Sequence, residues 1–255
     1  MSTGILPDAT MQDLTLLTCS YETPEITVAM LRSFLAHHPG RHRMLVVENS
    51  RDETTRDLLR ANGIRYLANP GGTHSPAVDL GLANIDTEHV LLLDTDIIFY
   101  DDVAPLYEQF RSQDLTLMGE VQESRGGYSL FPRVAPYCCF INLANLKMHG
   151  LRYHDQERID ATGSQGFFSN LPLQGDDGRK HYDVGSTLLE DCRALGLKVG
   201  QIADTLPEYV EHFEGMSWRE KSAIPHFEEW GKRVWQRFMA CAAPYKDVGL
   251  SGRFE

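Results

Sequence analysis

The feature that most constrains the fold is a short apolar run, Val90–Leu93, that ends directly in Asp94-Thr95-Asp96. A continuous apolar run of this length is typical of a strand buried on both faces, as at the centre of a parallel sheet. Two carboxylates after such a strand are costly to bury unless a cation or hydrogen bonds compensate them. In open α/β sheets, ligands lie beyond the carboxyl ends of the strands, where this pair falls. The simpler interpretation is a solvated Asp-Thr-Asp turn.

The residues before this run alternate between strand and helix patterns. Strands are predicted over 14–19, 43–47, 64–68 and 90–93, and helices over 26–37, from a cap at Asp52 to about 62, and from 75 to about 84. This order predicts an α/β fold with a mostly parallel sheet and right-handed crossovers, which is in the broad sense a nucleotide-binding architecture.

The second half of the chain has a less regular pattern. Helices are predicted over 102–109, 143–149, 182–195 and 219–241 (broken near Pro225), and strands over 115–119, 137–142 and 198–203. Residues 152–180 have no periodicity, and a loop of that length is usually functional or disordered. With no linker in view, we expect one α/β domain over 1–255, divided into 14–102, 103–218 and a C-terminal helical segment over 219–255.

Composition excludes several classes of protein. The chain is 42% hydrophobic and 24% charged, as in ordinary globular proteins, and its net charge of -12 argues against non-specific binding to nucleic acid or anionic membranes. No apolar stretch approaches the ~20 residues that span a bilayer. Residues 1–13 lack the features of a secretory signal.

The five cysteines are odd in number and include no C-x-x-C pair, and Cys19, Cys138 and Cys139 have apolar neighbours. They are typical of buried reduced thiols, so we expect a cytoplasmic protein.

Six segments in one order give the chain a resemblance to a known family. They are Leu16–Tyr21, Val46–Asp52, Asn69-Pro70-Gly71-Gly72, Asp94-Thr95-Asp96, Tyr182-Asp183, and His212 followed by Gly215, Ser217 and Trp218. Over about residues 14–218 the chain resembles the GT-A glycosyltransferases, most closely the inverting family 2 type. The resemblance implies a metal-dependent enzyme that moves a sugar from a nucleotide-diphosphate sugar, with UDP favoured, to an acceptor hydroxyl. Residues 14–102 would bind the donor and 103–218 the acceptor.

The resemblance also implies a nucleoside site after the first two strands. Thr18, Ser20 and Glu22 would line it, while Asn49 and Asp52 would read the base. The family more often has Asp where Asn49 stands, so the identity of the base stays open. Capping of the following helix explains Asp52 equally well.

The next two segments would bind the diphosphate. Gly71 and Gly72 allow the backbone to approach a ligand closely, although an ordinary tight turn also explains them. By resemblance, Asp96 binds Mn²⁺ or Mg²⁺ directly, and Asp94 contacts the ribose or the ion. Thr95 lies between them in the donor site. The cation would stabilise the charge on the leaving diphosphate.

The last segments supply a metal ligand and a base. His212 matches a His-x-x-Gly-x-Ser pattern, which implies a third metal ligand, although a lone histidine is more often structural. Ser217 and Trp218 would close over the diphosphate. Asp183, at the expected start of a helix over 183–195, would be the general base that deprotonates the acceptor. Helix capping is the alternative for Asp183.

Three other functions are alternatives to this one. A sugar-nucleotide-binding protein without transfer activity is disfavoured because both Asp94 and Asp96 are present. A nucleotidyltransferase needs a glycine-rich basic loop after the first strand, and residues 18–24 contain no Gly, Lys or Arg. A sugar transferase acting on a nucleobase in DNA stays open, since the segment around 152–180 contains four basic residues, although the acidic net charge weighs against it.

Overall fold

The computed structural model describes residues 11–123, 130–162, 180–213, 215–216 and 227–255. The first half contains β1 (Leu14–Ser20), α1 (Pro24–His37), β2 (Arg43–Glu48), α2 (Thr54–Ala61), β3 (Tyr66–Ala68), α3 (His74–Ala83), β4 (His89–Leu93) and β5 (Ile97–Phe99). The second half contains α4 (Ala104–Ser112), β6 (Leu117–Gly119), β7 (Val121–Gln122), β8 (Arg133–Val134), β9 (Cys138–Asn142), α5 (Leu143–His149), α6 (Gln156–Ala161), α7 (Ser186–Ala194), β10 (Val199–Gln201), α8 (Leu206–Tyr209), β11 (Val210–His212) and α9 (Phe227–Ala242).

A seven-stranded sheet in the order β10-β6-β9-β4-β1-β2-β3 crosses the molecule. The strands β3, β2, β1 and β4 are parallel, whereas β9 is antiparallel to both of its neighbours, β4 and β6. The predicted α/β fold with a mostly parallel sheet is therefore confirmed. Two small antiparallel pairs, β5–β11 and β7–β8, lie outside this sheet.

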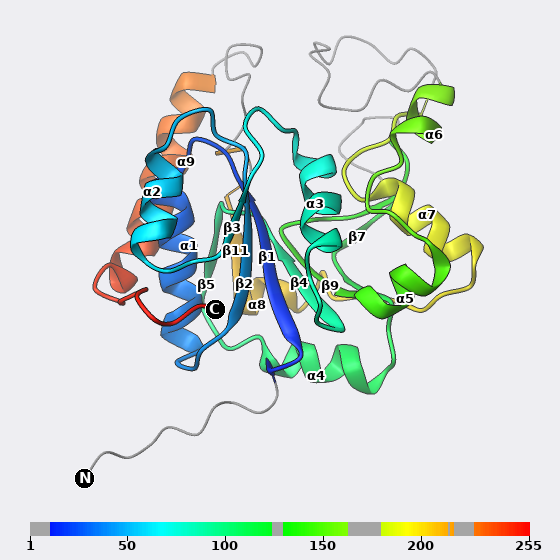
Figure 1. Ribbon diagram of the computed structural model, residues 1–255, viewed down its shortest axis with the longest axis horizontal. Coiled ribbons are helices and arrows are strands. Elements are labelled where there is room, and N and C mark those ends of the chain that lie inside the picture. Colours follow the sequence, from blue (N-terminus) through cyan, green and yellow to red (C-terminus); the bar gives the residue numbers. More distant parts are fainter. Residues whose placement is uncertain (1–10, 124–129, 163–179, 214, 217–226) are drawn as a thin grey trace.

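Helices cover both faces of the sheet, with α1 and α9 to its left and α3 and α7 to its right in Figure 1. Alternate residues of β4 enter two different cores: Leu93 packs in the cluster that contains Phe34 of α1, and Leu92 in the cluster that contains Val78 of α3. All five residues of β4 are buried. A central strand needs apolar side chains on both faces, which is why its sequence is a run rather than an alternation.

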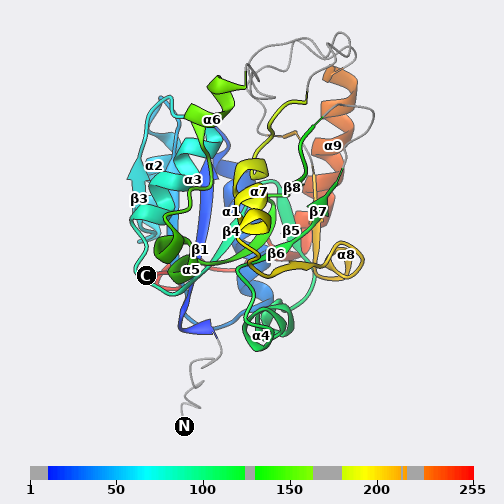
Figure 2. The same cartoon turned by 90° about the vertical axis from the view of Figure 1, so that its right-hand side faces the viewer.

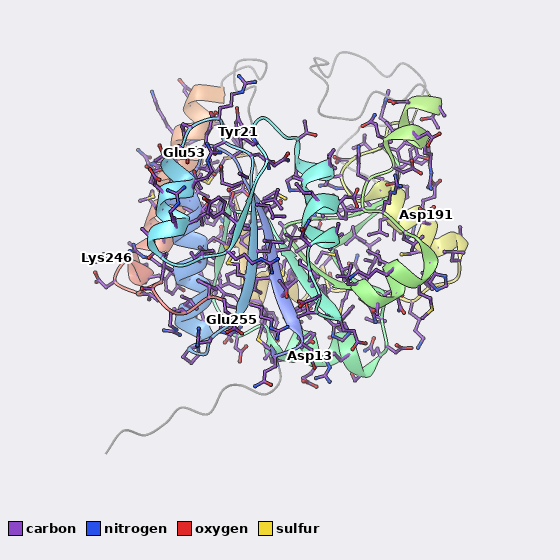
Figure 3. All side chains as sticks on the ribbon, viewed as in Figure 1. Asp13, Tyr21, Glu53, Asp191, Lys246 and Glu255 are labelled. Carbon is purple, nitrogen blue, oxygen red and sulfur yellow. The ribbon has the colours of Figure 1, made fainter. Side chains whose placement is uncertain are left out.

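The carboxyl ends of the parallel strands meet at one end of the molecule. Figures 1 and 2 show α4 at the opposite end, at the bottom of both views and near the start of β1. Glu53 and Lys246, labelled in Figure 3, are exposed at the periphery. No helix among the described residues is both long and apolar enough to cross a membrane.

The structure corrects several predicted elements. The third strand begins at Tyr66 rather than at 64, and β5, β7, β8, β11, α6 and α8 were not expected. The helix predicted from Tyr182 begins at Ser186, because Gly185 has a φ of +80° that no α-helix accommodates. Asp183 therefore precedes the helix. The expected break near Pro225 lies outside the described residues.

All five cysteines are free thiols, and Cys19, Cys138 and Cys139 are buried, as their apolar neighbours predicted. Burial raises the pKa of Cys138 to about 12, so this thiol stays protonated at neutral pH. A protonated, buried thiol is a weak nucleophile and a weak metal ligand, so Cys138 acts as a small core residue.

Candidate metal and nucleotide site

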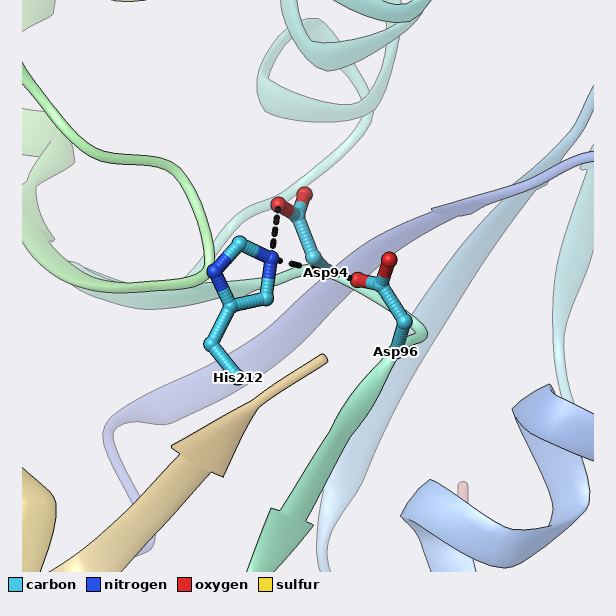
Figure 4. A group of neighbouring side chains, drawn as sticks. All are labelled: Asp94, Asp96 and His212. Atoms are coloured by element: carbon cyan, nitrogen blue, oxygen red, sulfur yellow. Dashed lines mark ion pairs between the residues drawn. The ribbon is translucent and has the colours of Figure 1, made fainter. Parts of the chain in front are cut away.

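Asp94, Asp96 and His212 converge at the carboxyl end of β4. One ligand atom from each lies within 4.8 Å of the other two. His212 Nε2 is 3.4 Å from Asp96 Oδ1 and 3.8 Å from Asp94 Oδ2, and Figure 4 shows the three side chains pointing toward one another. Carboxylate oxygens suit Mg²⁺ and Mn²⁺, and imidazole suits transition metals, so this donor set fits an ion such as Mn²⁺.

Strand pairing places His212 in this group, although it lies more than 110 residues further along the chain. The antiparallel pair β5–β11 sets His212 opposite Ile97, directly after Asp96. The backbone N–H of Phe213 donates to the carbonyl of Asp96 (2.8 Å), and that of Met216 donates to Asp96 Oδ2 (3.2 Å). The segment after β11 thus fixes the orientation of the Asp96 carboxylate.

The charges in this group depend on one another. Burial alone raises the pKa of Asp94, but a hydrogen bond from His74 and the positive charges of His74, His212 and Arg133 outweigh it, so the pKa is lowered. Burial alone lowers the pKa of His212, but a hydrogen bond to Asp96 and the charges of Asp96 and Asp94 raise it. The imidazolium and the carboxylates thereby compensate one another, and a divalent cation can replace the proton of His212.

His74 and Tyr137 complete the surroundings of the group, and the sequence analysis missed both. His74 Nε2, at the start of α3, is 3.1 Å from Asp94 Oδ1. The ring of Tyr137 stacks on His212 with centroids 4.4 Å apart, and its carbonyl accepts from the Asp94 N–H (3.3 Å). His74 could have been identified from the sequence because it lies just after the Gly-Gly loop. No sequence pattern marks Tyr137 as part of the site.

Two hydroxyls of β1 are buried beside the carboxyl ends of the strands. Thr18 Oγ1 and Ser20 Oγ are inaccessible to solvent and bond to no described residue. A buried hydroxyl without a partner costs about 1–3 kcal/mol. Such donors are usually kept for a ligand or a water molecule, as expected of the nucleoside site that the sequence predicted.

The loop after β3 packs against the end of β2. Asn69 Nδ2 donates to Asn49 Oδ1 (2.8 Å), and the Gly71 N–H donates to the Asn49 carbonyl (2.8 Å). Gly71 has a φ of +76°, which favours glycine. At Gly72 a Cβ would stand 1.9 Å from Asn69 Nδ2 and 2.6 Å from Asn49 Oδ1. Close packing, and not only a tight turn, therefore explains the second glycine.

Replacing Gly72 by Ala is expected to break the Asn69–Asn49 hydrogen bond, because the new methyl group displaces both amides. The loss is on the order of 1 kcal/mol, which lowers Tm by roughly 2–4 °C in a domain of this size. Differential scanning calorimetry measures it. Gly249→Ala is the matched control, since nothing lies within 4 Å of its Cβ position. Equal melting temperatures for both variants would contradict the packing role of Gly72.

The other predicted donor residues that the structure describes have different surroundings. Glu22 has a φ of +49°, and its N–H donates to Ser50 Oγ (2.6 Å). Asp52 is exposed and accepts from the Thr54 N–H (3.0 Å), but the N-cap residue of α2 is Glu53, so Asp52 is not the helix cap that the sequence allowed. Thr95 is buried between the two aspartates. Ser217 and Trp218 lie outside the described residues.

Asp183 is buried in an ion pair that the sequence did not reveal. Its Oδ2 is 2.8 Å from Arg133 Nη1, and its Oδ1 accepts from the Val184 N–H (2.7 Å). Its side chain is 0% exposed and that of Arg133 is 10% exposed. The carboxylate is not a side-chain cap of α7, whose N-cap residue is Gly185.

The family model described as "Glycosyltransferase like family 2" matches residues 12–169 of the chain. No curated protein matches the sequence of this chain significantly. Among solved structures, S. aureus TarS 1-349 in complex with UDP-GlcNAc has a TM-score of 0.52 at 15% identity, covering 89% of this chain and 66% of that one. The mannosyltransferase PcManGT from Pyrobaculum calidifontis, in complex with GDP-Man and Mn²⁺, has a TM-score of 0.56 at 11% identity. The match covers 96% of this chain and 73% of PcManGT.

The galactosyltransferase LgtC, in complex with donor and acceptor sugar analogues, has a TM-score of 0.50 at 18% identity, and the match covers 92% of this chain and 97% of LgtC. The match covers only 39% of the longer TarS chain. At these identities the likeness concerns the fold. Because the family model spans more than half of the sequence, the chain belongs to the glycosyltransferase-like family 2 and has the GT-A glycosyltransferase fold.

Proposed function

We propose that the protein is a metal-dependent glycosyltransferase that moves a sugar from a nucleotide-diphosphate sugar to an acceptor hydroxyl with inversion. The convergence of Asp94, Asp96 and His212 carries this proposal, because it unites the donor set of a divalent cation at the ligand-binding end of the sheet. In this proposal the chain is one domain over 1–255 and acts in the cytoplasm, where its five free thiols stay reduced.

The donor half of the site would bind the nucleotide. Thr18 and Ser20 have buried hydroxyls available for the nucleoside, and Asn49 would contact the base. Asp94, Asp96 and His212 would hold Mn²⁺ or Mg²⁺ together with the diphosphate. A bound divalent cation supplies charge stabilisation for the departing diphosphate. We favour UDP as the nucleotide. Proteins of similar fold have been solved in complex with UDP-GlcNAc and with GDP-Man, so a binding test should include both a uridine and a guanosine donor.

The acceptor half would supply the base. The acceptor oxygen forms a bond to the anomeric carbon while the bond from that carbon to the diphosphate oxygen breaks. The electron pair of the broken bond leaves with the diphosphate, and the acceptor proton passes to the Asp183 carboxylate. In-line attack of this kind inverts the anomeric configuration.

Thermal unfolding with sugar nucleotides tests the proposal. We expect UDP-GlcNAc or GDP-mannose to raise Tm in the presence of Mn²⁺ and to lose this effect with EDTA. A ligand at 100 times its Kd stabilises the folded protein by about 2.7 kcal/mol. ATP with Mn²⁺ is the control nucleotide. Absence of any metal-dependent shift with either donor would overturn the proposal, and metal-dependent binding without donor hydrolysis would favour a binding protein without transfer activity.

A further inference from the structure

A continuous set of contacts joins the metal group to Asp183. The ring of Tyr137 stacks on His212, and the Tyr137 hydroxyl donates a hydrogen bond to Glu120 Oε2. Glu120 Oε1 accepts from Gln122 Nε2 (2.8 Å), and Gln122 Oε1 accepts from Arg133 Nε (2.7 Å). Arg133 Nη1 then contacts Asp183 at 2.8 Å.

The pairing of β7 with β8 sets Gln122 beside Arg133. The strands pair antiparallel with Gln122 opposite Arg133, so the two side chains leave the same side of the pair. Three residues after β8, Tyr137 already contacts Asp94 and His212. Arg133 thus lies only four residues before Tyr137, which contacts the metal group, and itself contacts Asp183.

Gly185 brings Asp183 against this stretch. Its φ is +80°, and a Cβ there would stand 2.5 Å from the carbonyl oxygen of Val134. The loop before α7 therefore packs backbone to backbone on β8, which no larger residue allows. This close approach sets the carboxylate of Asp183 beside the guanidinium of Arg133.

Fold stability alone does not explain the Arg133–Asp183 pair. A buried ion pair contributes little net stability, because desolvation of both charges offsets their attraction, and apolar residues of similar volume often serve as well. A planar guanidinium bonded on two edges does fix the orientation of a carboxylate. Arg133 is bonded in this way, through Nε to Gln122 and through Nη1 to Asp183.

We infer that Arg133 is the positioning residue for Asp183. Gln122 and Glu120 hold the Arg133 side chain in a fixed position relative to the metal group. The inference rests on the proposed role of Asp183 as base. Because the positive charge of Arg133 also acts on Asp94, only a substitution that keeps this charge tests the contact with Asp183 alone. Such a substitution is expected to lower turnover without changing the affinity for the nucleotide.

Two substitutions test this role. Arg133→Lys keeps the charge but cannot bind Gln122 and Asp183 together in one plane, and Gln122→Ala leaves the ion pair in place and removes only its support. Misplacement of a reacting group by about 1 Å costs about 10²-fold in rate. We expect kcat for donor hydrolysis to fall by about that factor in Arg133→Lys and by about tenfold in Gln122→Ala, with Kd for UDP or GDP plus Mn²⁺ unchanged.

The assay uses whichever of UDP-GlcNAc and GDP-mannose gives the larger Mn²⁺-dependent stabilisation, with water as acceptor. Arg193→Lys is the matched control, because Arg193 forms an exposed ion pair with Glu123 in the same half of the molecule. Wild-type turnover in Arg133→Lys and Gln122→Ala, with turnover lost in Asp183→Asn, would overturn the positioning role and leave the base assignment intact. A parallel loss of nucleotide affinity would also overturn it. Wild-type turnover in Asp183→Asn would instead contradict the proposed base.

Discussion

Asp183→Asn is expected to lower sugar transfer by about 10²–10⁴-fold, the usual contribution of a general base. Asparagine keeps the size of the side chain and one acceptor oxygen for Arg133, but it cannot take the acceptor proton. Because transfer depends on the base and donor binding does not, KM for the donor and Kd for the nucleotide should stay unchanged. Steady-state kinetics and calorimetric titration measure the two quantities.

The ion pair adds a stability effect to this experiment. Asp183→Asn leaves the charge of Arg133 buried without its counter-charge, which lowers the free energy of unfolding. Rates are therefore to be compared well below the Tm of the variant. Asp191→Asn is the matched control, since Asp191 on α7 also pairs with an arginine, Arg158, at 2.8 Å and its side chain is 24% exposed. Near-wild-type transfer by Asp183→Asn would exclude it as the base, and a product of retained configuration would exclude inversion.

Asp96→Ala is expected to abolish metal-dependent nucleotide binding. Both oxygens of Asp96 take part in the group: Oδ1 lies 3.4 Å from His212, and Oδ2 accepts from the Met216 N–H. Removal of a residue that only supports a metal ligand typically costs 10–100-fold in affinity, so loss of a ligand should cost more than about 100-fold. Titration with Mn²⁺, followed by electron paramagnetic resonance and by thermal shift with nucleotide, measures this loss.

Asp86→Ala is the control for Asp96, because the Asp86 side chain is 90% exposed, pairs only loosely with Arg43 (3.9 Å) and is not a member of the metal group. Both variants should give the circular dichroism spectrum of the wild type. If Asp96→Ala bound Mn²⁺ and nucleotide as the wild type does, the metal site would have to lie elsewhere in the chain.

The sequence alone determined the framework of the donor half. The strands β1, β2 and β4 could be recognised because a strand buried on both faces must be a continuous apolar run, which is a local property. The position of Asp94 and Asp96 at the strand end follows from the same run. Gly71 and Asn49 could be noticed because they lie within three residues of the ends of predicted strands.

The tertiary structure decided which distant side chains meet. The family resemblance had already implied His212 as a third metal ligand, but the sequence did not show how it reaches Asp96. It does so through the register of β11 on β5, and strands of three residues carry too little pattern to be recognised from sequence. Arg133 reaches Asp183 because Gly185 lets two loops approach closely, and nothing near residue 133 or 183 encodes that contact locally. A buried charge is set by its partner in space, so only the folded chain reveals the pair.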